Sequence, residues 1–156
     1  MLSKSLVLTL LPVAITFLAG AMLPFQAASN GALSKALGHP LWAALVSLVV
    51  SILVLLFLLW LNKAPAPLLG GAFQSAWWIW TGGVMGALYV TCAAAFAPRL
   101  GAGSFIVLVV AGQMITAIVV DHFGLMALTP KPVTLARVLG VALIMAGAIF
   151  IQFSKD

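Results

Sequence analysis

Charge is scarce in this 156-residue chain, and negative charge is almost missing. Charged residues make up 6% of the sequence, against about 25% in an ordinary soluble domain, and the only acidic residues are Asp121 and Asp156. The chain has two histidines and a single cysteine, Cys92, which excludes a disulfide within one chain. Catalysis and metal binding need grouped acids, histidines or thiols. We therefore expect no enzyme, no cofactor and no metal.

Basic residues are also few, and they are dispersed. The net charge of +5 comes from seven lysines and arginines that stand singly between apolar stretches. A nucleic-acid-binding surface would need basic residues grouped on one polar face. The sequence therefore predicts no nucleic-acid partner.

Apolar residues dominate instead, at 65% of the chain with a mean hydropathy of +1.29. About 20 apolar residues in a helix span the roughly 30 Å of a bilayer's hydrocarbon core. The runs predict an all-α integral membrane protein, a single five-helix domain over residues 1–156 in contact with membrane lipid. The expected spans are 6–28, 41–61, 77–97, 102–120 and 134–152.

The first run admits two interpretations. A basic residue, an apolar core and small residues also describe a signal peptide, but four more spans follow, which favours a membrane helix. Pro24 predicts a kink, and the helical pattern continues until Gly38-His39-Pro40. Gln26 and Asn30, four residues apart, share a helix face. They mark either an interfacial helix end or a helix that reaches a water-filled cavity.

The second apolar run is marked by tryptophans near its ends, and the third by a face of small residues. Trp42 and Trp60 near the ends of the second run are typical of the two membrane interfaces, and we expect this helix to pack and face lipid. In the third run, Gly82 and Gly86 form a small-residue face that favours close helix packing. The last run carries a similar stripe that includes Gly140.

Polar groups at membrane depth are the best candidates for function. Tyr89 and Gln113 lie near the midplane of the third and fourth runs, and Thr116 follows on the Gln113 face. The tyrosine hydroxyl needs a partner at that depth. Gln113 and a bound substrate are both candidates.

Asp121 and His122 end the fourth run. Asp121 is the only acid near a membrane span, so this pair is the candidate for proton coupling. The alternative is that both residues cap a helix end at the interface.

An odd number of spans places the termini on opposite sides of the membrane, and the basic residues barely favour either side. The two sets are Lys4, Lys63, Lys131 and Arg137 against Lys35, Arg99 and Lys155. Because the excess of Lys and Arg in cytoplasmic loops normally sets orientation, this chain is predicted to insert both ways. Two opposed copies would form an inverted pair of the kind found in alternating-access transporters.

Several short motifs occur in order along nearly the whole chain. They are Gln26-xxx-Asn30, Gly86-Ala87-Leu88-Tyr89-Val90, Pro98-Arg99-Leu100-Gly101, Gly112-Gln113, Asp121-His122-Phe123-Gly124 and Leu139-Gly140-Val141-Ala142-Leu143-Ile144-Met145-Ala146-Gly147. In these the chain resembles the YdcZ-like family of the drug/metabolite transporter superfamily. The resemblance implies a bacterial inner-membrane transporter and half of a ten-helix inverted repeat, completed by antiparallel dimerisation with itself or a paralogue.

One branch of that superfamily fits poorly. Small multidrug resistance proteins use a glutamate in the first helix to exchange cations for protons, and no carboxylate lies between Met1 and Val120 here. We therefore expect a secondary-active transporter of a small neutral or zwitterionic metabolite or drug-like solute. The alternatives are a non-transporting assembly subunit and a cation exporter of the small multidrug resistance type. The expected substrate-binding residues are Thr16, Gln26, Asn30, Tyr89, Gln113 and Thr116.

Overall fold

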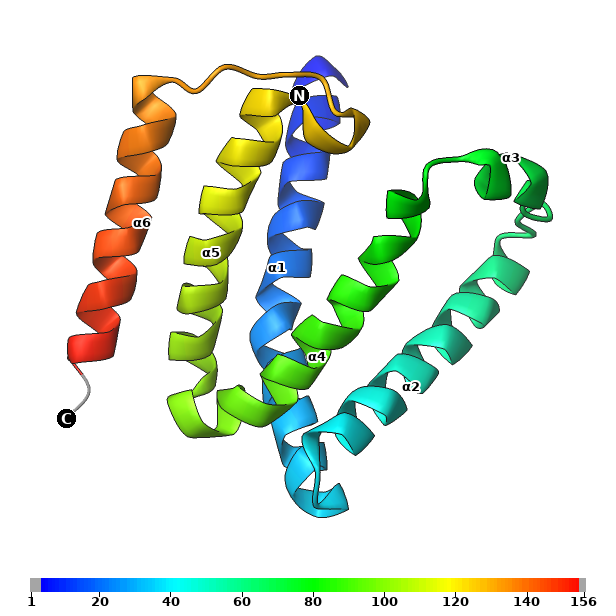
Figure 1. The fold of residues 1–156 in the computed structure, drawn as a ribbon, viewed down its shortest axis with the longest axis horizontal. Helices are drawn as coiled ribbons and strands as arrows, with labels where there is room; N and C mark the ends of the chain where they lie inside the picture. Colours follow the sequence, from blue (N-terminus) through cyan, green and yellow to red (C-terminus); the bar gives the residue numbers. More distant parts are fainter. Residues whose placement is uncertain (1–3, 155–156) are drawn as a thin grey trace.

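The computed structural model describes residues 4–154, which form helices joined by short connections (Figure 1). Five helices are long and apolar enough to cross a membrane, as the apolar runs predict. They are α1 (Lys4–Leu37), α2 (Pro40–Leu61), α4 (Thr81–Leu100), α5 (Ala102–Phe123) and α6 (Leu135–Phe153). The short helices are α3 (Leu69–Gln74) and the 3-10 turns η1 (Trp77–Trp80) and η2 (Leu125–Ala127).

Helix α1 is much longer than a bilayer requires. It runs for 34 residues, about 51 Å, through Pro12 and Pro24. Gly38 ends it, and His39 begins α2 by accepting a hydrogen bond from the Leu41 backbone N–H on its Nδ1, at 3.2 Å. Because α1 exceeds the roughly 30 Å of hydrocarbon, it must tilt or extend beyond it.

Helices α4 and α5 form a hairpin around one residue. Gly101 stands between them with φ +83°, a left-handed conformation that side chains with a Cβ rarely adopt. From this turn the two helices diverge (Figure 1). They are therefore closest near Gly101 and further apart towards the opposite membrane face.

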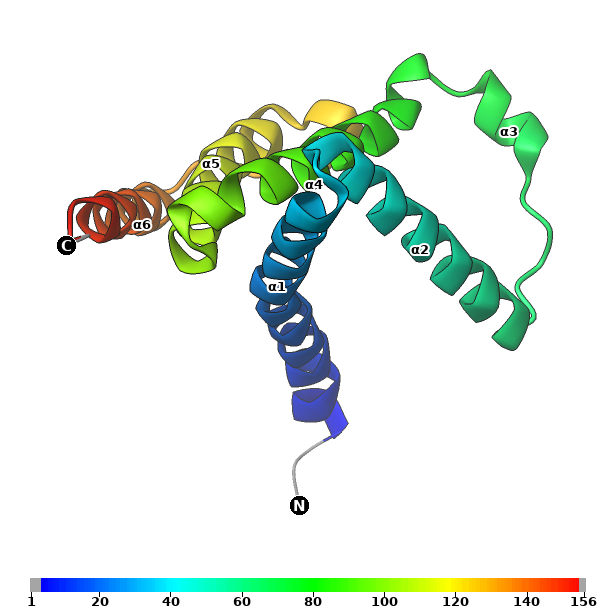
Figure 2. The same cartoon turned by 90° about the horizontal axis from the view of Figure 1, so that it is seen from below.

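The five long helices form an open arrangement. Figure 2 shows α6, α5 and α4 in a row, with α1 and α2 projecting from the α4 side of this row and diverging from each other. The first described turn of α1 and the last of α6 lie at opposite ends of the molecule (Figure 1). The side chain of Lys4 and the whole of Lys155 lie outside the described residues, so they are not placed.

The small core lies where the second half of α1 meets α4. Ala27, Ala93, Ala97 and Phe105 are buried together, with Tyr89 packed beside them. Small side chains let the helix backbones approach closely, which is how helices associate in a membrane. The first half of α1 does not take part, since every side chain from Leu8 to Met22 is exposed.

The small-residue faces singled out in the sequence lie elsewhere. A Cβ added at Gly82, Gly86 or Gly140 would meet no atom within 4 Å. Gly82 and Gly86 are open within one chain because α4 contacts α1 further along, around residues 90–97, and Gly140 lines a pocket of about 220 Å³ between α5 and α6. A role for them in packing remains a prediction about contacts between chains.

The contact between Gly31 and Pro98 provides a test of this core. A Cβ at Gly31 would lie 2.6 Å from Pro98 Cγ, whereas one at Gly20, also in α1, would meet nothing within 4 Å. Alanine gains about 1 kcal/mol of helix propensity over glycine, and overpacking costs about 1–3 kcal/mol. We expect Gly31→Ala to lower the thermal unfolding temperature in detergent and Gly20→Ala to leave it unchanged or higher.

A Pro98→Ala background supplies the control, because it removes the clashing ring. Gly31→Ala should then lose most of its cost. An equal cost in both backgrounds would show that this contact does not limit the approach of α1 to α4.

Candidate functional site

Gln113 and Thr116 lie side by side on the open face of α5. They line a groove of about 550 Å³ together with Val109, Asp121 and Leu128. Both side chains are exposed, and the Thr116 hydroxyl donates to the Gly112 carbonyl at 3.0 Å. The Gln113 amide is therefore presented to whatever fills this groove.

Tyr89 lies across the hairpin from this groove, and its hydroxyl is buried. The ring packs 6.3 Å from that of Phe105, centroid to centroid, and among residues 4–154 the hydroxyl oxygen has no hydrogen-bond partner. Tyr89 and Gln113 are about equally far along their helices from Gly101. The Tyr89–Gln113 bond is nevertheless not formed, because α4 and α5 diverge before they reach this level.

Asn30 occupies a second environment, between α1 and α2. Its side chain is buried, 5% exposed, and its Nδ2 has no partner among the described residues. Gln26, one turn earlier, is exposed. A shared helix face therefore did not give these two amides a shared environment, because the fully buried positions described on α1 occur only from Ala27 onwards.

The six residues expected at a substrate site fall into separate groups in one chain. Gln113 and Thr116 line the α5 groove, Tyr89 lies at the α4–α5 contact, and Asn30 lies between α1 and α2. Thr16 and Gln26 are exposed on α1, where the Thr16 hydroxyl donates to the Pro12 carbonyl at 2.8 Å. A single copy does not enclose all six in one cavity.

Two serines of α2 line a groove that was not predicted from the sequence. Ser47 and Ser51 line the groove beside Asn30, and Ser47 is half-buried, whereas α2 was expected only to face lipid. Their spacing of four residues places both on one helix face. This pattern could have revealed a polar stripe within an otherwise aliphatic span.

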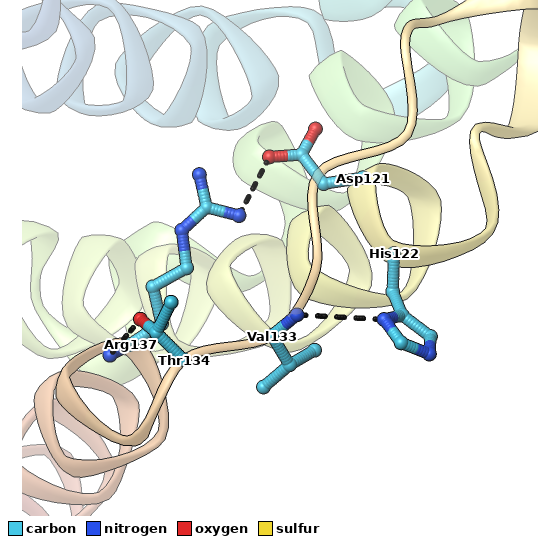
Figure 3. Close-up of polar contacts among 5 residues, drawn as sticks. All are labelled: Asp121, His122, Val133, Thr134 and Arg137. Atoms are coloured by element: carbon cyan, nitrogen blue, oxygen red, sulfur yellow. Dashed lines mark hydrogen bonds and ion pairs between the residues drawn. The ribbon is translucent and has the colours of Figure 1, made fainter.

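Asp121 and His122 hold the connection between α5 and α6 (Figure 3). The Arg137 guanidinium lies 3.3 Å from the Asp121 carboxylate, and the Asp121 carbonyl accepts from the Lys131 backbone N–H at 2.7 Å. His122 Nδ1 accepts from the Val133 backbone N–H at 3.4 Å. These contacts fasten the loop to the end of α5.

Arg137 was missed as the partner of Asp121. Its place in the first turn of α6 is stabilised by Thr134, whose hydroxyl accepts from the Arg137 backbone N–H at 3.3 Å. The end of one span and the start of the next lie on the same side of the membrane, which could have predicted the pairing. The contacts of Asp121 with Arg137 and of His122 with Val133 are those of a helix end fastened to its loop, and proton coupling by this pair stays a prediction.

Residues 4–154 contain no group of three His, Cys, Asp or Glu side chains that could hold a metal ion. The polar groups available at membrane depth are neutral amides and hydroxyls. They can donate and accept hydrogen bonds to a solute without any change of charge.

Comparison with known protein families gives one match over nearly the whole chain. The family model for DMT_YdcZ, described as "Putative inner membrane exporter, YdcZ", matches residues 11–150. This is a family of membrane exporters and not of enzymes. Comparison with curated proteins and with solved structures found no match.

The Asp121–Arg137 pair yields a prediction that separates its two interpretations. The side chains are 31% and 38% exposed, so water screens the pair and we expect coupling of about 1 kcal/mol or less. Asp121→Asn and Arg137→Gln should each lower the thermal unfolding temperature, and the double variant should lower it little further. Lys131→Gln, which changes a neighbouring cation, should leave it unchanged.

The exchanged pair, Asp121→Arg with Arg137→Asp, should restore stability and also retain solute flux in proteoliposomes. Restored stability with lost flux would show that Asp121 acts in transport beyond the ion pair, either by proton transfer or as a lining residue of the α5 groove.

Proposed function

Because the chain belongs to the YdcZ family of the drug/metabolite transporter superfamily, we propose that it carries a small neutral or zwitterionic solute by alternating access between two antiparallel copies. The family match and the five spanning helices make it a multi-pass inner membrane protein and, in general terms, a transporter. The observation that carries the finer proposal is the pair of buried, unpartnered polar groups, Asn30 Nδ2 and Tyr89 Oη.

A buried polar group without a hydrogen-bond partner lowers the stability of the folded protein, and an apolar residue at the same position would not. A buried donor without a partner costs about 1–3 kcal/mol, and leucine or phenylalanine of similar shape would remove the cost. A subunit that serves only assembly would keep both groups only if another chain bonded each of them. A transporter gains hydrogen bonds to its solute, which supports transport over the assembly alternative.

A second copy would complete the site. The side chains from Leu8 to Met22 are exposed, and Thr16 and Gln26 lie on the exposed surface of α1. An opposed copy packed there would enclose these side chains with the Gln113–Thr116 groove. The near-balance of basic residues on the two sides supports antiparallel insertion, either as a homodimer or with a paralogue of opposite bias.

A neutral or zwitterionic solute fits the available groups better than a cation. Asp121, the acid at the end of α5, is paired with Arg137. The remaining expected site residues are amides and hydroxyls, which offer no negative charge to a cation inside the membrane. This argues against a cation exporter of the small multidrug resistance type.

Gln113 provides the most direct test. Gln113→Leu should leave the protein folded, because the side chain is exposed and has no intrachain role to lose. Solute binding should fall about tenfold, equivalent to about 1.4 kcal/mol. Binding is read from the ligand-induced rise in unfolding temperature, using a solute found by thermal-shift screening.

Gln152→Leu is the matched control for this substitution. Gln152 Nε2 donates to the Ser104 carbonyl at 3.4 Å, so its loss should loosen the α5–α6 contact and leave binding intact. Equal binding by wild type and Gln113→Leu would remove Gln113 from the site.

Tyr89→Phe removes only the unpartnered hydroxyl. Without solute, we expect unchanged or slightly raised stability, because the buried hydroxyl has no hydrogen-bond partner among residues 4–154 to lose. Solute binding should weaken, because the hydroxyl forms its hydrogen bond only when the solute is bound. Lowered stability in the absence of solute would show that another chain, and not the solute, satisfies Tyr89.

Dual insertion is tested with a reporter at the C-terminus. The unmodified protein should give comparable signal on both sides of the membrane, and two lysines added after Asp156 should shift the C-terminus to the cytoplasm. A uniform orientation without the added lysines would leave only a paralogue of opposite bias as the partner.

A further inference from the structure

The groove between α1 and α2 is distinct from the α5 groove of the proposed transport site. It has a volume of about 520 Å³, within the range of small-molecule sites. Its polar lining consists of Asn30 and three serines, and its apolar lining of valines and leucines. The lining residues that carry the argument are Ser29, Asn30, Ser47, Val50, Ser51 and Val54.

Asn30 makes this groove more than a gap between diverging helices. It is the most buried polar side chain among the described residues, 5% exposed, and its Nδ2 donates to nothing. It lies about as far from the α1–α2 turn as Ser47 does on the opposite wall. Ser51 lies one helical turn beyond Ser47 on the same face of α2, so a ligand head that contacts Asn30 has both serines along the facing wall.

The serines complement the amide. The Ser51 hydroxyl donates to the Ser47 carbonyl at 2.9 Å, which leaves the Ser51 oxygen free to accept. Asn30 Nδ2 can donate and Ser51 Oγ can accept. A hydroxyl or an N–H-bearing amide satisfies both, because each can accept one hydrogen bond and donate another.

The rest of the lining limits what can carry that group. No charged residue lines the groove, so a cationic or anionic head would be desolvated without a counter-charge. Val50 and Val54 are exposed, so the groove is open along its side. Asn30 on α1 and Ser51 on α2 lie roughly 10 and 16 Å from the turn along their helices, within the apolar stretches of both.

We infer that the α1–α2 groove binds an uncharged amphiphile, a hydrocarbon chain ending in an alcohol or amide, which reaches it from within the bilayer. The head is held between Asn30 and Ser51, and the chain lies along the aliphatic wall of α2. The inference rests on the proposed transport function only in calling this amphiphile a substrate, since binding itself requires no transport.

Photolabelling in proteoliposomes tests the binding. Three probes share one diazirine-bearing hydrocarbon chain and end in a hydroxyl, a trimethylammonium or a carboxylate. The alcohol should label peptides from residues 29–33 and 46–55, at least tenfold more than either charged probe. Comparable labelling by all three would overturn the inference, because it would show only lipid filling the space between helices.

Asn30→Leu and Ser51→Ala should each reduce labelling by the alcohol about tenfold. Ser75→Ala is the matched control, since the Ser75 hydroxyl makes the same bond to the carbonyl four residues earlier, Gly71, at 2.8 Å but lies outside the groove. Asn30→Leu should also raise the unfolding temperature of the unliganded protein, because it removes an unpartnered donor. Undiminished labelling of a folded Asn30→Leu protein would overturn the inference.

A second copy is the competing occupant. In a Cys92→Ala background, Val54→Cys, which lies in the groove but does not hold the head, should react with a lipid-soluble maleimide, and the alcohol should slow this reaction. Protection before any alcohol is added would show that another chain covers the groove, which also overturns the inference. Labelling at the groove without flux of the same alcohol would preserve the inference and count against its role as a transported substrate.

A short-chain alcohol and a long-chain diacylglycerol, each added as competitor, distinguish a free solute from a resident lipid. Competition by both supports the shared hydroxyl chemistry, and competition by one identifies the source. Failure of both to compete would overturn the inference.

Discussion

The close approach of α1 to α4 determines where the helices of this chain touch and where grooves remain between them. Gly31 lies against Pro98, and alanines line the contact on both sides, so the helices touch over only the second half of α1. Beyond this contact the first half of α1, the far end of α2 and the upper part of α4 diverge (Figures 1 and 2). A short contact made by small residues thus leaves two long grooves instead of a filled core.

The scarcity of charge decides which chemistry those grooves can offer. The chain keeps its ion pair, Asp121–Arg137, at a helix end, where water lowers the cost of desolvation. Within the spans it uses amides and hydroxyls, which can recognise neutral donors and acceptors. Recognition by hydrogen bonding suits a bilayer interior, because each bond there has no competing water.

Hydropathy predicted the five spanning helices, because apolar length is a property of each segment alone. It did not predict which faces meet. Gln26 and Asn30 share a face in sequence yet differ in burial, since the described side chains of α1 become buried only from Ala27 onwards. Tyr89 and Gln113 share a depth yet do not bond, since hairpin divergence is a tertiary property. Arg137 was missed because its partner lies on another helix, and Ser47 and Ser51 because the groove that they line is completed by α1.

The two unpartnered groups need different kinds of partner. Asn30 lies beside a groove that its own chain builds, with Ser51 already placed to complement a ligand's hydroxyl or amide. Tyr89 instead packs against the buried cluster where α1, α4 and α5 meet, 6.3 Å from the Phe105 ring, and it lines neither the α1–α2 groove nor the α5 groove. A ligand in the α1–α2 groove can therefore satisfy Asn30 without any change in helix packing. Satisfying the Tyr89 hydroxyl requires the helices around it to separate or a further group to reach it, because the hydroxyl is buried within the contact itself.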